Sequence, residues 1–294
     1  MKALLLEIPL FLLAAYFWVD VKWLKMRGRR APFNELMLRT PGHSARELHR
    51  DTVVNLLLYM VGVAATPFFV AALFSQSTAA NWILAASGTL LIGFCFFQSV
   101  RLFRMAIRRN LGVEAELFTG SELSLLMRDG AWVFHDIPYQ YGNIDHVVIG
   151  TGGIFAIETK GFNKPTKTGL SGAENATLTV KDGALQFPTG GRTKAPLEQA
   201  KLHAKWIREE IQRRFGLSVP VRAVVALPGW MINGGFDDDC WVVNPKRGNS
   251  LRSAVTKQIV EPQTATMIAA WVEDLARSVA HKSKEFDADS GTGF

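Results

Sequence analysis

The chain has 294 residues, of which 48% are hydrophobic, and a formal net charge of +7. Its mean hydropathy of +0.11 is high for a wholly soluble protein and excludes that class. Residues 1–110 hold 13 basic and 5 acidic side chains and residues 111–294 hold 20 and 21, so the basic excess is no evidence for a nucleic-acid ligand. Two cysteines, Cys95 and Cys240, exclude a disulfide framework and a cysteine-based metal site.

Three long apolar runs lie at about residues 3–19, 53–74 and 82–100. At about 1.5 Å of rise per helical residue they reach roughly 25, 33 and 28 Å, against a bilayer hydrocarbon core of about 30 Å. The second and third runs are predicted transmembrane spans. The first contains Glu7, so it either spans the bilayer or lies in its interface. Residues 1–110 are therefore predicted to form a transmembrane helical region.

The basic residues of this region are distributed unevenly around the apolar runs. Residues 20–51 carry eight Lys and Arg and residues 101–109 carry four Arg, whereas residues 75–81 carry no charge. Basic loops stay on the cytoplasmic side of a membrane. The pattern predicts a multi-pass protein of a bacterial inner membrane, with the lipid bilayer as a partner and the rest of the chain in the cytoplasm.

From Leu111 the pattern changes to short apolar strands and amphipathic helices, which predicts one α/β domain over residues 111–280 and a disordered tail over 281–294. Helices are predicted at 116–127, from Pro196 onward and at 263–280. Strands are predicted at 132–137, 143–149, 153–159, 177–180, 184–187, 221–227 and 241–243. An Asp182-Gly183 turn is expected to join the fourth and fifth of these strands.

The second and third predicted strands carry charged residues in a specific register. A symmetric turn through their glycine-rich connection pairs Asp145 with Glu158, and Lys160 shares the face of Glu158 because side chains alternate along a strand. Apolar neighbours disfavour two unpaired carboxylates, and a divalent cation would neutralise them. The residue types fit metal-assisted phosphodiester hydrolysis with Mg²⁺, or with Mn²⁺ as the alternative. On spacing alone, a metal-free cross-strand ion pair is the simpler interpretation.

Further segments accompany this pattern in a fixed order. They are Gly120 and Glu122 in the predicted helix, Ile144-Asp145-His146-Val147-Val148, Gly153-Ile154-Phe155, Glu158-Thr159-Lys160 and Ala195-Pro196-Leu197-Glu198-Gln199. The set resembles the nuclease-related domain (NERD) family, which is similar to the PD-(D/E)xK phosphodiesterase superfamily, over about residues 112–230. The ordered set is more specific than any one motif.

The resemblance implies a restriction-endonuclease-like α/β fold, a mixed sheet flanked by helices. It implies metal ligands at Asp145 and Glu158, with Lys160 as the catalytic amine. It also implies that Glu122 and Gln199 line the site, although Glu122 fits a helix-capping box equally well and Gln199 fits a solvated helix position.

Two functions remain in competition. The first is a membrane-anchored, Mg²⁺-dependent nuclease that acts on nucleic acid, DNA in preference to RNA, on the cytoplasmic side. The second is an inactive nuclease-like binding or scaffolding module on the membrane. Residues 159–214 hold 11 basic and 5 acidic side chains, which suits either a phosphate backbone or a solvated helix face. No aromatic platform for bases is visible. His135, His146 and His203 show no metal-ligand or triad spacing, and His146 is expected on the sheet face opposite Asp145, so these histidines are predicted to lie in the core or behind the site.

Overall fold

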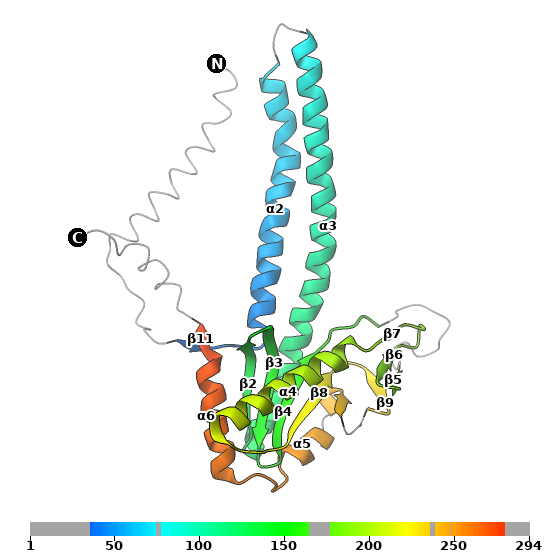
Figure 1. The fold of residues 1–294 in the computed structure, drawn as a ribbon. Helices are drawn as coiled ribbons and strands as arrows, with labels where there is room; N and C mark the ends of the chain where they lie inside the picture. The colour runs from blue at the N-terminus through cyan, green and yellow to red at the C-terminus, as the bar shows by residue number, and fades with distance from the viewer. Residues whose placement is uncertain (1–35, 75–77, 165–176, 236–238, 248, 280–294) are drawn as a thin grey trace, which may run out of the picture. The chain divides into compact units, whose positions relative to one another are not determined.

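The computed structural model describes residues 36–74, 78–164, 177–235, 239–247 and 249–279 (Figure 1). The predicted first span, 3–19, and the predicted tail, 281–294, lie outside the described residues.

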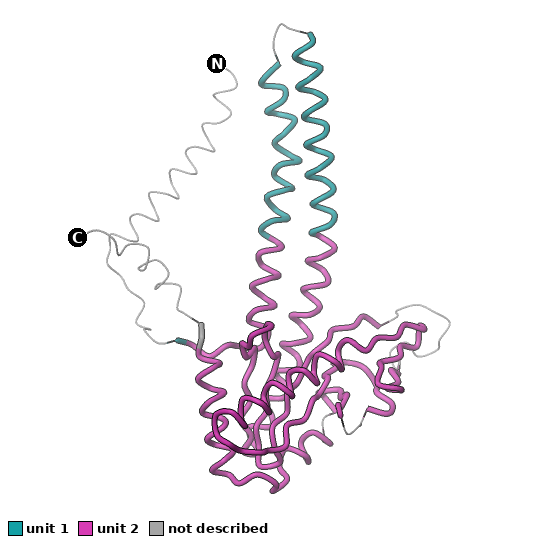
Figure 2. Tube along the Cα trace, viewed as in Figure 1, with its two compact units in different colours: residues 1–36, 54–102, 280–294 teal, residues 37–53, 103–279 magenta. Residues whose placement is uncertain are grey.

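The chain divides into two compact units (Figure 2). Unit 1 comprises Met1–Leu36, Val54–Leu102 and Ala280–Phe294, and unit 2 comprises Met37–Val53 and Phe103–Val279. Unit 2 thus includes two segments that precede residue 110. The division of the chain into a transmembrane region and an α/β domain at residue 110 stays a prediction.

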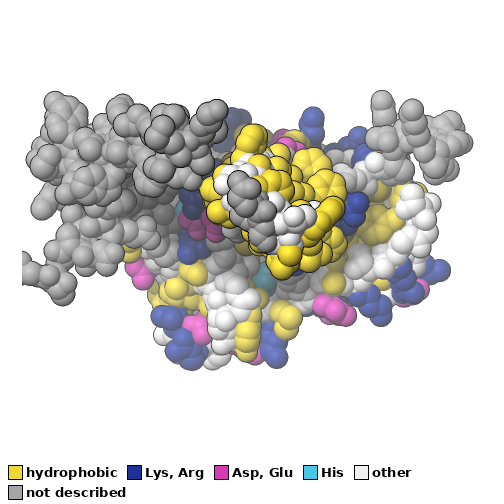
Figure 3. Space-filling model, turned by 90° about the horizontal axis from the view of Figure 1, so that it is seen from above, with side chains coloured by type: hydrophobic (Ala, Val, Ile, Leu, Met, Phe, Trp, Pro, Cys, Tyr) yellow, Lys and Arg dark blue, Asp and Glu magenta, His cyan; other side chains and the backbone are white. Residues whose placement is uncertain are grey.

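Unit 1 contains most of two long apolar helices, α2 (His43–Ala72) and α3 (Thr78–Ser124). The predicted span 53–74 begins within α2 and extends just beyond the end of that helix at Ala72. The predicted span 82–100 lies wholly within α3. By length and composition both helices could cross a membrane, and their apolar windows are only 6% and 11% buried. Hydrophobic side chains cover the helical pair when it is viewed from above (Figure 3).

Small residues let the two helices of unit 1 approach closely. A Cβ added at Gly88 would collide with Val70, and one added at Gly62 would lie 3.1 Å from the Cys95 sulfur. Close contact through glycine is typical of helices that pack in a membrane.

The helix α3 continues beyond the predicted third span. It runs to Ser124 and is followed by the 3₁₀-helix η1 (Leu125–Asp129). The predicted helix 116–127 is therefore the end of a longer helix. Residues 101–116 contain one glycine and no proline, so nothing in that stretch ends the helix.

Unit 2 is built on a five-stranded mixed sheet in the order β10-β8-β4-β3-β2. The strands are β2 (Trp132–Tyr139), β3 (Gly142–Gly150), β4 (Gly153–Thr159), β8 (Val221–Ala226) and β10 (Cys240–Val243). β2, β3 and β4 pair antiparallel, while β8 is parallel to β4 and β10 is parallel to β8. The predicted α/β class with a mixed sheet flanked by helices is confirmed. Its restriction-endonuclease-like character stays a prediction.

The register of the β3–β4 hairpin agrees with the predicted symmetric turn. Gly150 pairs with Gly153, and the pairing continues to His146 opposite Ile157. One step further along this register lie Asp145 and Glu158. The turn needs glycine at residue 153, where φ is +123° and a Cβ would lie 2.7 Å from the Pro220 carbonyl oxygen.

Helices cover both faces of this sheet (Figure 1). On one face lie α4 (Ala195–Phe215), which confirms the helix predicted from Pro196, and α6 (Pro262–Ala276). These two helices enclose a core that includes Val147, Ile149 and Ala156. On the other face, α5 (Asn249–Val255), η1 and the end of α3 pack against a core of Val148, Phe155 and Ile157. The predicted alternation of the hairpin side chains is thus confirmed.

A second sheet of four strands has the order β7-β6-β5-β9. Its strands are β5 (Thr177–Lys181), β6 (Ala184–Gln186), β7 (Arg192–Thr193) and β9 (Met231–Asn233). The predicted Asp182-Gly183 turn joins β5 to β6, with φ of 51° and 62° at its two residues. The strands β7 and β9 were not predicted.

The two ends of unit 2 pair with each other. The strand β1 (Met37–Leu38) lies antiparallel to β11 (Arg277–Val279). The predicted helix 263–280 is therefore too long. It ends at Ala276, because the backbone of the next residues is paired with β1.

Candidate active site

The carboxylates of Asp145 and Glu158 lie at one end of the β3–β4 hairpin. The Thr159 backbone N–H donates a hydrogen bond of 2.7 Å to Asp145 Oδ2, which fixes that carboxylate against the end of β4. Glu158 is buried, with 1% of its surface exposed, while Asp145 is partly exposed. The hairpin brings together the two residues that the sequence singled out as metal ligands.

Lys160 joins this pair from the position directly after the end of β4. Its Nζ is 2.5 Å from Glu158 Oε1, and its side chain is 34% exposed. The Lys160 backbone N–H donates to the Ala226 carbonyl, 3.0 Å away, so the chain remains tied to β8 at this point. The ammonium therefore bridges a buried carboxylate and the surface.

A third carboxylate, Glu116, comes from α3. The helix passes close to the end of β4 at Gly161, where a Cβ would lie 2.7 Å from the Leu111 carbonyl oxygen. Burial, and then the charges of Asp136 and Glu158, raise the pKa of Glu116 to about 7. Sequence reasoning missed this residue because a helix that passes the end of a strand leaves no local pattern.

Glu122, which the resemblance placed in the site, lies further along α3. Six residues at about 100° each rotate it by roughly 240° from Glu116, onto another face of the helix. Within the described part of the chain, Glu122 makes no hydrogen bond or ion pair with Asp145, Glu158 or Lys160. Its role in the site stays a prediction.

Gln199 lies in the first turns of α4 and is partly exposed. It precedes His203 by four residues, so the two share one face of the helix. His203 is fully buried, and its Nδ1 is 3.4 Å from Glu158 Oε2. The face of α4 that carries Gln199 therefore faces the carboxylates, although the function of Gln199 stays a prediction.

The electrostatics of the cluster formed by Glu116, Asp145, Glu158 and Lys160 disfavour three ionised carboxylates. Burial, and then Glu158 and Glu116, raise the pKa of Asp145 well above its usual value. Burial also raises the pKa of Glu158, against the opposing effect of Lys160. Burial lowers the pKa of Lys160, but Glu158 and the other carboxylates outweigh it and the net shift is upward. One ammonium does not neutralise three acids, so the cluster can accept more positive charge.

A pair of histidines supports the hairpin from the other sheet face. The Nδ1 atoms of His135 and His146 are 2.8 Å apart, so one donates to the other, and His146 Nε2 is 3.1 Å from the Thr159 hydroxyl. Burial lowers the pKa of His135 to about 4, and burial and the neighbouring His135 lower the pKa of His146 well below its usual value, so both are neutral at pH 7. Thr159 thus links this neutral pair to Asp145.

A polar network joins β2 to the start of α2. Asp136 is buried in a left-handed conformation, with φ of 54°. Its Oδ2 accepts hydrogen bonds from Arg39 at 2.8 Å and from the Ser44 hydroxyl at 2.7 Å. The segment that precedes α2 is therefore anchored beside the carboxylate cluster.

Aromatic rings border the cluster, which the sequence did not indicate. Tyr139 contacts the His203 ring at a centroid distance of 5.2 Å and the Tyr141 ring at 6.0 Å. Tyr141, at the tip of the β2–β3 hairpin, is 80% exposed. An exposed ring at this position could stack on a nucleic-acid base.

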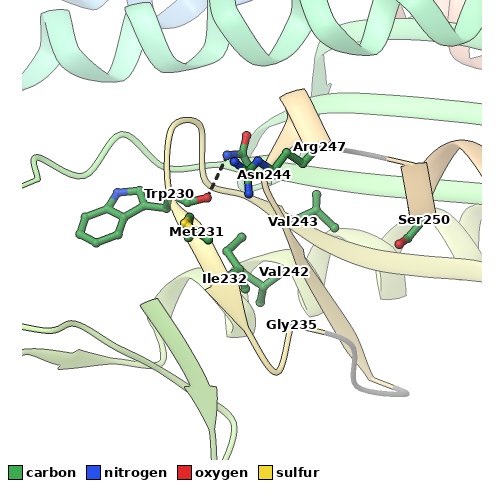
Figure 4. A pocket seen from close by; sticks show the side chains of 9 residues that line it. All are labelled: Trp230, Met231, Ile232, Gly235, Val242, Val243, Asn244, Arg247 and Ser250. Carbon is green, nitrogen blue, oxygen red and sulfur yellow. Dashed lines mark hydrogen bonds between the residues drawn. The ribbon is translucent and has the colours of Figure 1, made fainter. Parts of the chain in front are cut away.

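A pocket of about 160 Å³ lies elsewhere in unit 2, between β9, β10 and α5 (Figure 4). Its lining includes Met231, Val242 and Arg247, and Asn244 donates a hydrogen bond of 2.9 Å to the Trp230 carbonyl at its edge. None of its lining residues is an acid or a histidine. The pocket therefore shares no residue with the carboxylate cluster and lacks its acidic side chains.

In the residues that the structure describes, no three His, Cys, Asp or Glu side chains are arranged so as to hold a metal ion together. The Lys160 ammonium instead pairs with Glu158 Oε1. A cation would have to bind the remaining carboxylate oxygens, and Glu158 Oε2 is buried without a hydrogen-bond partner.

Comparison with known proteins identifies the family to which this part of the chain is similar. Residues 111–228 match the family described as nuclease-related domain, which confirms the resemblance expected from the sequence. Comparisons with curated proteins and with solved structures return no match.

Proposed function

We propose that the protein is a membrane-anchored nuclease that hydrolyses phosphodiester bonds with the help of a divalent cation, because residues 111–228 match the nuclease-related domain family. The observation that carries the proposal is the convergence of Asp145, Glu158 and Lys160 at one end of the β3–β4 hairpin.

The residues of the cluster fit a hard divalent cation. Among the described residues, Glu158 Oε2 is a buried oxygen without a hydrogen-bond partner. Burial raises the pKa values of Glu116, Asp145 and Glu158, and neighbouring carboxylates add to the shifts of Glu116 and Asp145. Carboxylate oxygens are the ligands that Mg²⁺ and Mn²⁺ take. Asp145 and Glu158 would hold the cation, and Glu116 supplies a further acid within their electrostatic reach.

The protein groups have separate tasks in this proposal. A bound divalent cation polarises the scissile phosphate and lowers the pKa of a bound water. The Thr159 N–H orients the Asp145 carboxylate, and burial holds Glu158 in place. Lys160, partly exposed beside Glu158, would donate hydrogen bonds to the negative charge that develops in the transition state. Gln199 and Glu122 would contact the substrate at the edge of the site.

Nucleic acid is the proposed substrate, with DNA preferred to RNA. The segment after β4 carries exposed basic side chains, among which Lys205 and Arg213 lie on α4. Both form exposed ion pairs with glutamates of the same helix, and such pairs are weak enough to exchange for phosphate contacts.

The setting that we propose is the cytoplasmic face of a bacterial inner membrane. The apolar helices α2 and α3 support an anchor by length and composition. The basic residues after the third apolar run support a cytoplasmic position for the nuclease-related domain.

A binding or scaffolding module without activity is the competing function. The ion pair between Lys160 and Glu158 is compatible with it, because such a pair can serve stability alone. In that case the charged cluster serves only stability and recognition.

Cleavage by the full chain in detergent separates the two functions. Wild-type protein is incubated with single-stranded DNA, double-stranded DNA and RNA in Mg²⁺, in Mn²⁺ and in EDTA. Asp145→Asn removes a proposed ligand, and Asp182→Asn is the matched control, because Asp182 is an exposed turn residue in which Asn tolerates the left-handed conformation. The proposal requires metal-dependent cleavage that only Asp145→Asn abolishes.

A further inference from the structure

His203 is a buried histidine without hydrogen-bond partners. Its exposed fraction is 0%, and neither ring nitrogen has a partner among the described residues. Its Nδ1 lies 3.4 Å from Glu158 Oε2, which is also buried and unpartnered, and the pair does not meet the geometry of a hydrogen bond. Two adjacent buried polar atoms that satisfy no hydrogen bond are unfavourable and indicate that a third group belongs between them.

The surroundings of His203 hold its ring in place. The edge of the Tyr139 ring packs against the imidazole, with the planes at 80°. On α4, Ala200, Ala204 and Ile207 are part of the core, so the helix cannot rotate to turn the ring away.

The distance between the two unpartnered atoms matches that of neighbouring ligands on one cation. If each atom lies about 2.1–2.2 Å from a shared ion, a separation of 3.4 Å corresponds to an angle of roughly 105°, close to the values of common coordination geometries. Lys160 contacts the other oxygen, Oε1, and so leaves this side of Glu158 open to a ligand.

We infer that His203 Nδ1 and Glu158 Oε2 bind the same divalent cation, and that this nitrogen ligand makes the site prefer Mn²⁺ to Mg²⁺. The inference rests on the proposed function, because it adds a ligand to the proposed metal site. Imidazole suits transition-metal ions, whereas Mg²⁺ favours oxygen ligands. The first ligand set predicted from the sequence contained oxygens only.

The test uses metal binding by the full chain in detergent, without nucleic acid. Mn²⁺ is titrated while free Mn²⁺ is followed by electron paramagnetic resonance, and Mg²⁺ is added as a competitor. Pulsed measurements then detect magnetic coupling between bound Mn²⁺ and a histidine nitrogen. His203→Gln is compared with His43→Gln, because His43 pairs with the exposed Glu47 of its own helix, at 3.7 Å.

The expected result is a nitrogen coupling in the wild-type protein and in His43→Gln, and a loss of that coupling in His203→Gln. His203→Gln should weaken Mn²⁺ binding by about tenfold or more and change Mg²⁺ binding by less than about threefold. If His203→Gln fails to fold, the wild-type spectrum still tests the inference, because a bound Mn²⁺ without nitrogen coupling would reject it. Bound Mn²⁺ without nitrogen coupling, or equal affinities for the two ions, would overturn the inference.

The outcome is separable from that of the proposed function. Nitrogen coupling in a protein that cleaves no nucleic acid would support the metal ligand and reject the nuclease. Metal-dependent cleavage without nitrogen coupling would support the nuclease and reject His203 as a ligand.

Discussion

Lys160 Nζ and Glu158 Oε1 are 2.5 Å apart at the end of β4, and the opposite oxygen of the same carboxylate has no hydrogen-bond partner. Only one of the two oxygens of the Glu158 carboxylate is thus paired with a positive charge. Asp145 and Glu116 add two more acids to the same cluster, and both have a raised pKa. Buried acids with raised pKa values are common where a protein binds a cation or performs catalysis, and they lower the stability of the fold when no cation is bound.

The first prediction is that Asp145→Asn stabilises the protein without metal while it abolishes cleavage. The substitution keeps the volume of the side chain and removes a charge that partial burial, and then Glu158 and Glu116, disfavour. In EDTA at pH 7.5 the melting temperature should rise by a few degrees, which corresponds to about 1 kcal/mol. A scaffold held together by an ion-pair cluster should instead lose stability, so a lower melting temperature with no change in activity would favour that alternative.

The second prediction concerns pH. An acid whose pKa is raised in the folded state binds more protons than the unfolded chain, so its stabilising contribution is present at low pH and is lost as pH rises through the folded pKa. For Glu116 that value is about 7. The buried histidines oppose this trend around their unfolded pKa of about 6.5, so the contribution of Glu116 is read from the difference between the wild-type protein and Glu116→Gln. Between pH 6.5 and 8 in EDTA, the wild-type protein should therefore lose stability relative to Glu116→Gln.

Calorimetry or circular dichroism at several pH values checks this expectation. Mn²⁺ or Mg²⁺ should restore the lost stability, and more strongly at pH 8 than at pH 6.5, because ionised carboxylates bind cations better. A difference in stability between the wild-type protein and Glu116→Gln that stays constant from pH 6.5 to 8 in EDTA would contradict the assignment of the cluster.

The third prediction compares two glutamates on α3. Glu116→Gln should weaken metal binding and lower the cleavage rate by about tenfold or more, because Glu116 lies within the electrostatic reach of Asp145 and Glu158. Glu122→Gln should change metal binding little, because Glu122 is on another face of the helix. Titration with Mn²⁺ and cleavage rates of both variants measure the difference. If Glu122→Gln alone lost metal binding, the role implied by the family resemblance would be restored to that residue.

The hairpin of the site could be predicted from the sequence, because a symmetric glycine turn and alternating apolar residues specify the pairing and the face of every residue between Asp145 and Glu158. Lys160 followed from the same alternation. The fold class followed from short apolar strands that alternate with amphipathic helices.

The remaining residues of the site depend on contacts between elements far apart in the chain. Glu116 enters the site because Gly161 allows α3 to pass close to the end of β4, and His203 because α4 packs across β4 and β8. Neither contact leaves a spacing signal in the sequence. The pairing of β1 with β11 was missed for the same reason, since two or three residues are too few to show a strand pattern.

The fourth prediction concerns topology. A reporter fused after Asn110 should show cytoplasmic activity, because the arginines of residues 101–109 and the basic residues of 20–51 resist translocation. A fusion within residues 75–77 should report the opposite side. Activity of the Asn110 fusion on the periplasmic side would reject the proposed orientation without bearing on the chemistry of the site.

The most direct test of the central claim is a paired measurement of cleavage rate and metal affinity for wild-type protein and Lys160→Ala. In the proposed enzyme Lys160 acts mainly on the charge of the transition state, so its loss should lower the cleavage rate by about a hundredfold or more. Metal affinity should persist, because the substitution leaves the carboxylates of Asp145 and Glu158 free to bind. A folded wild-type protein that is inert toward DNA and RNA in both Mg²⁺ and Mn²⁺, with a Lys160→Ala variant that differs only in melting temperature, would contradict the nuclease assignment.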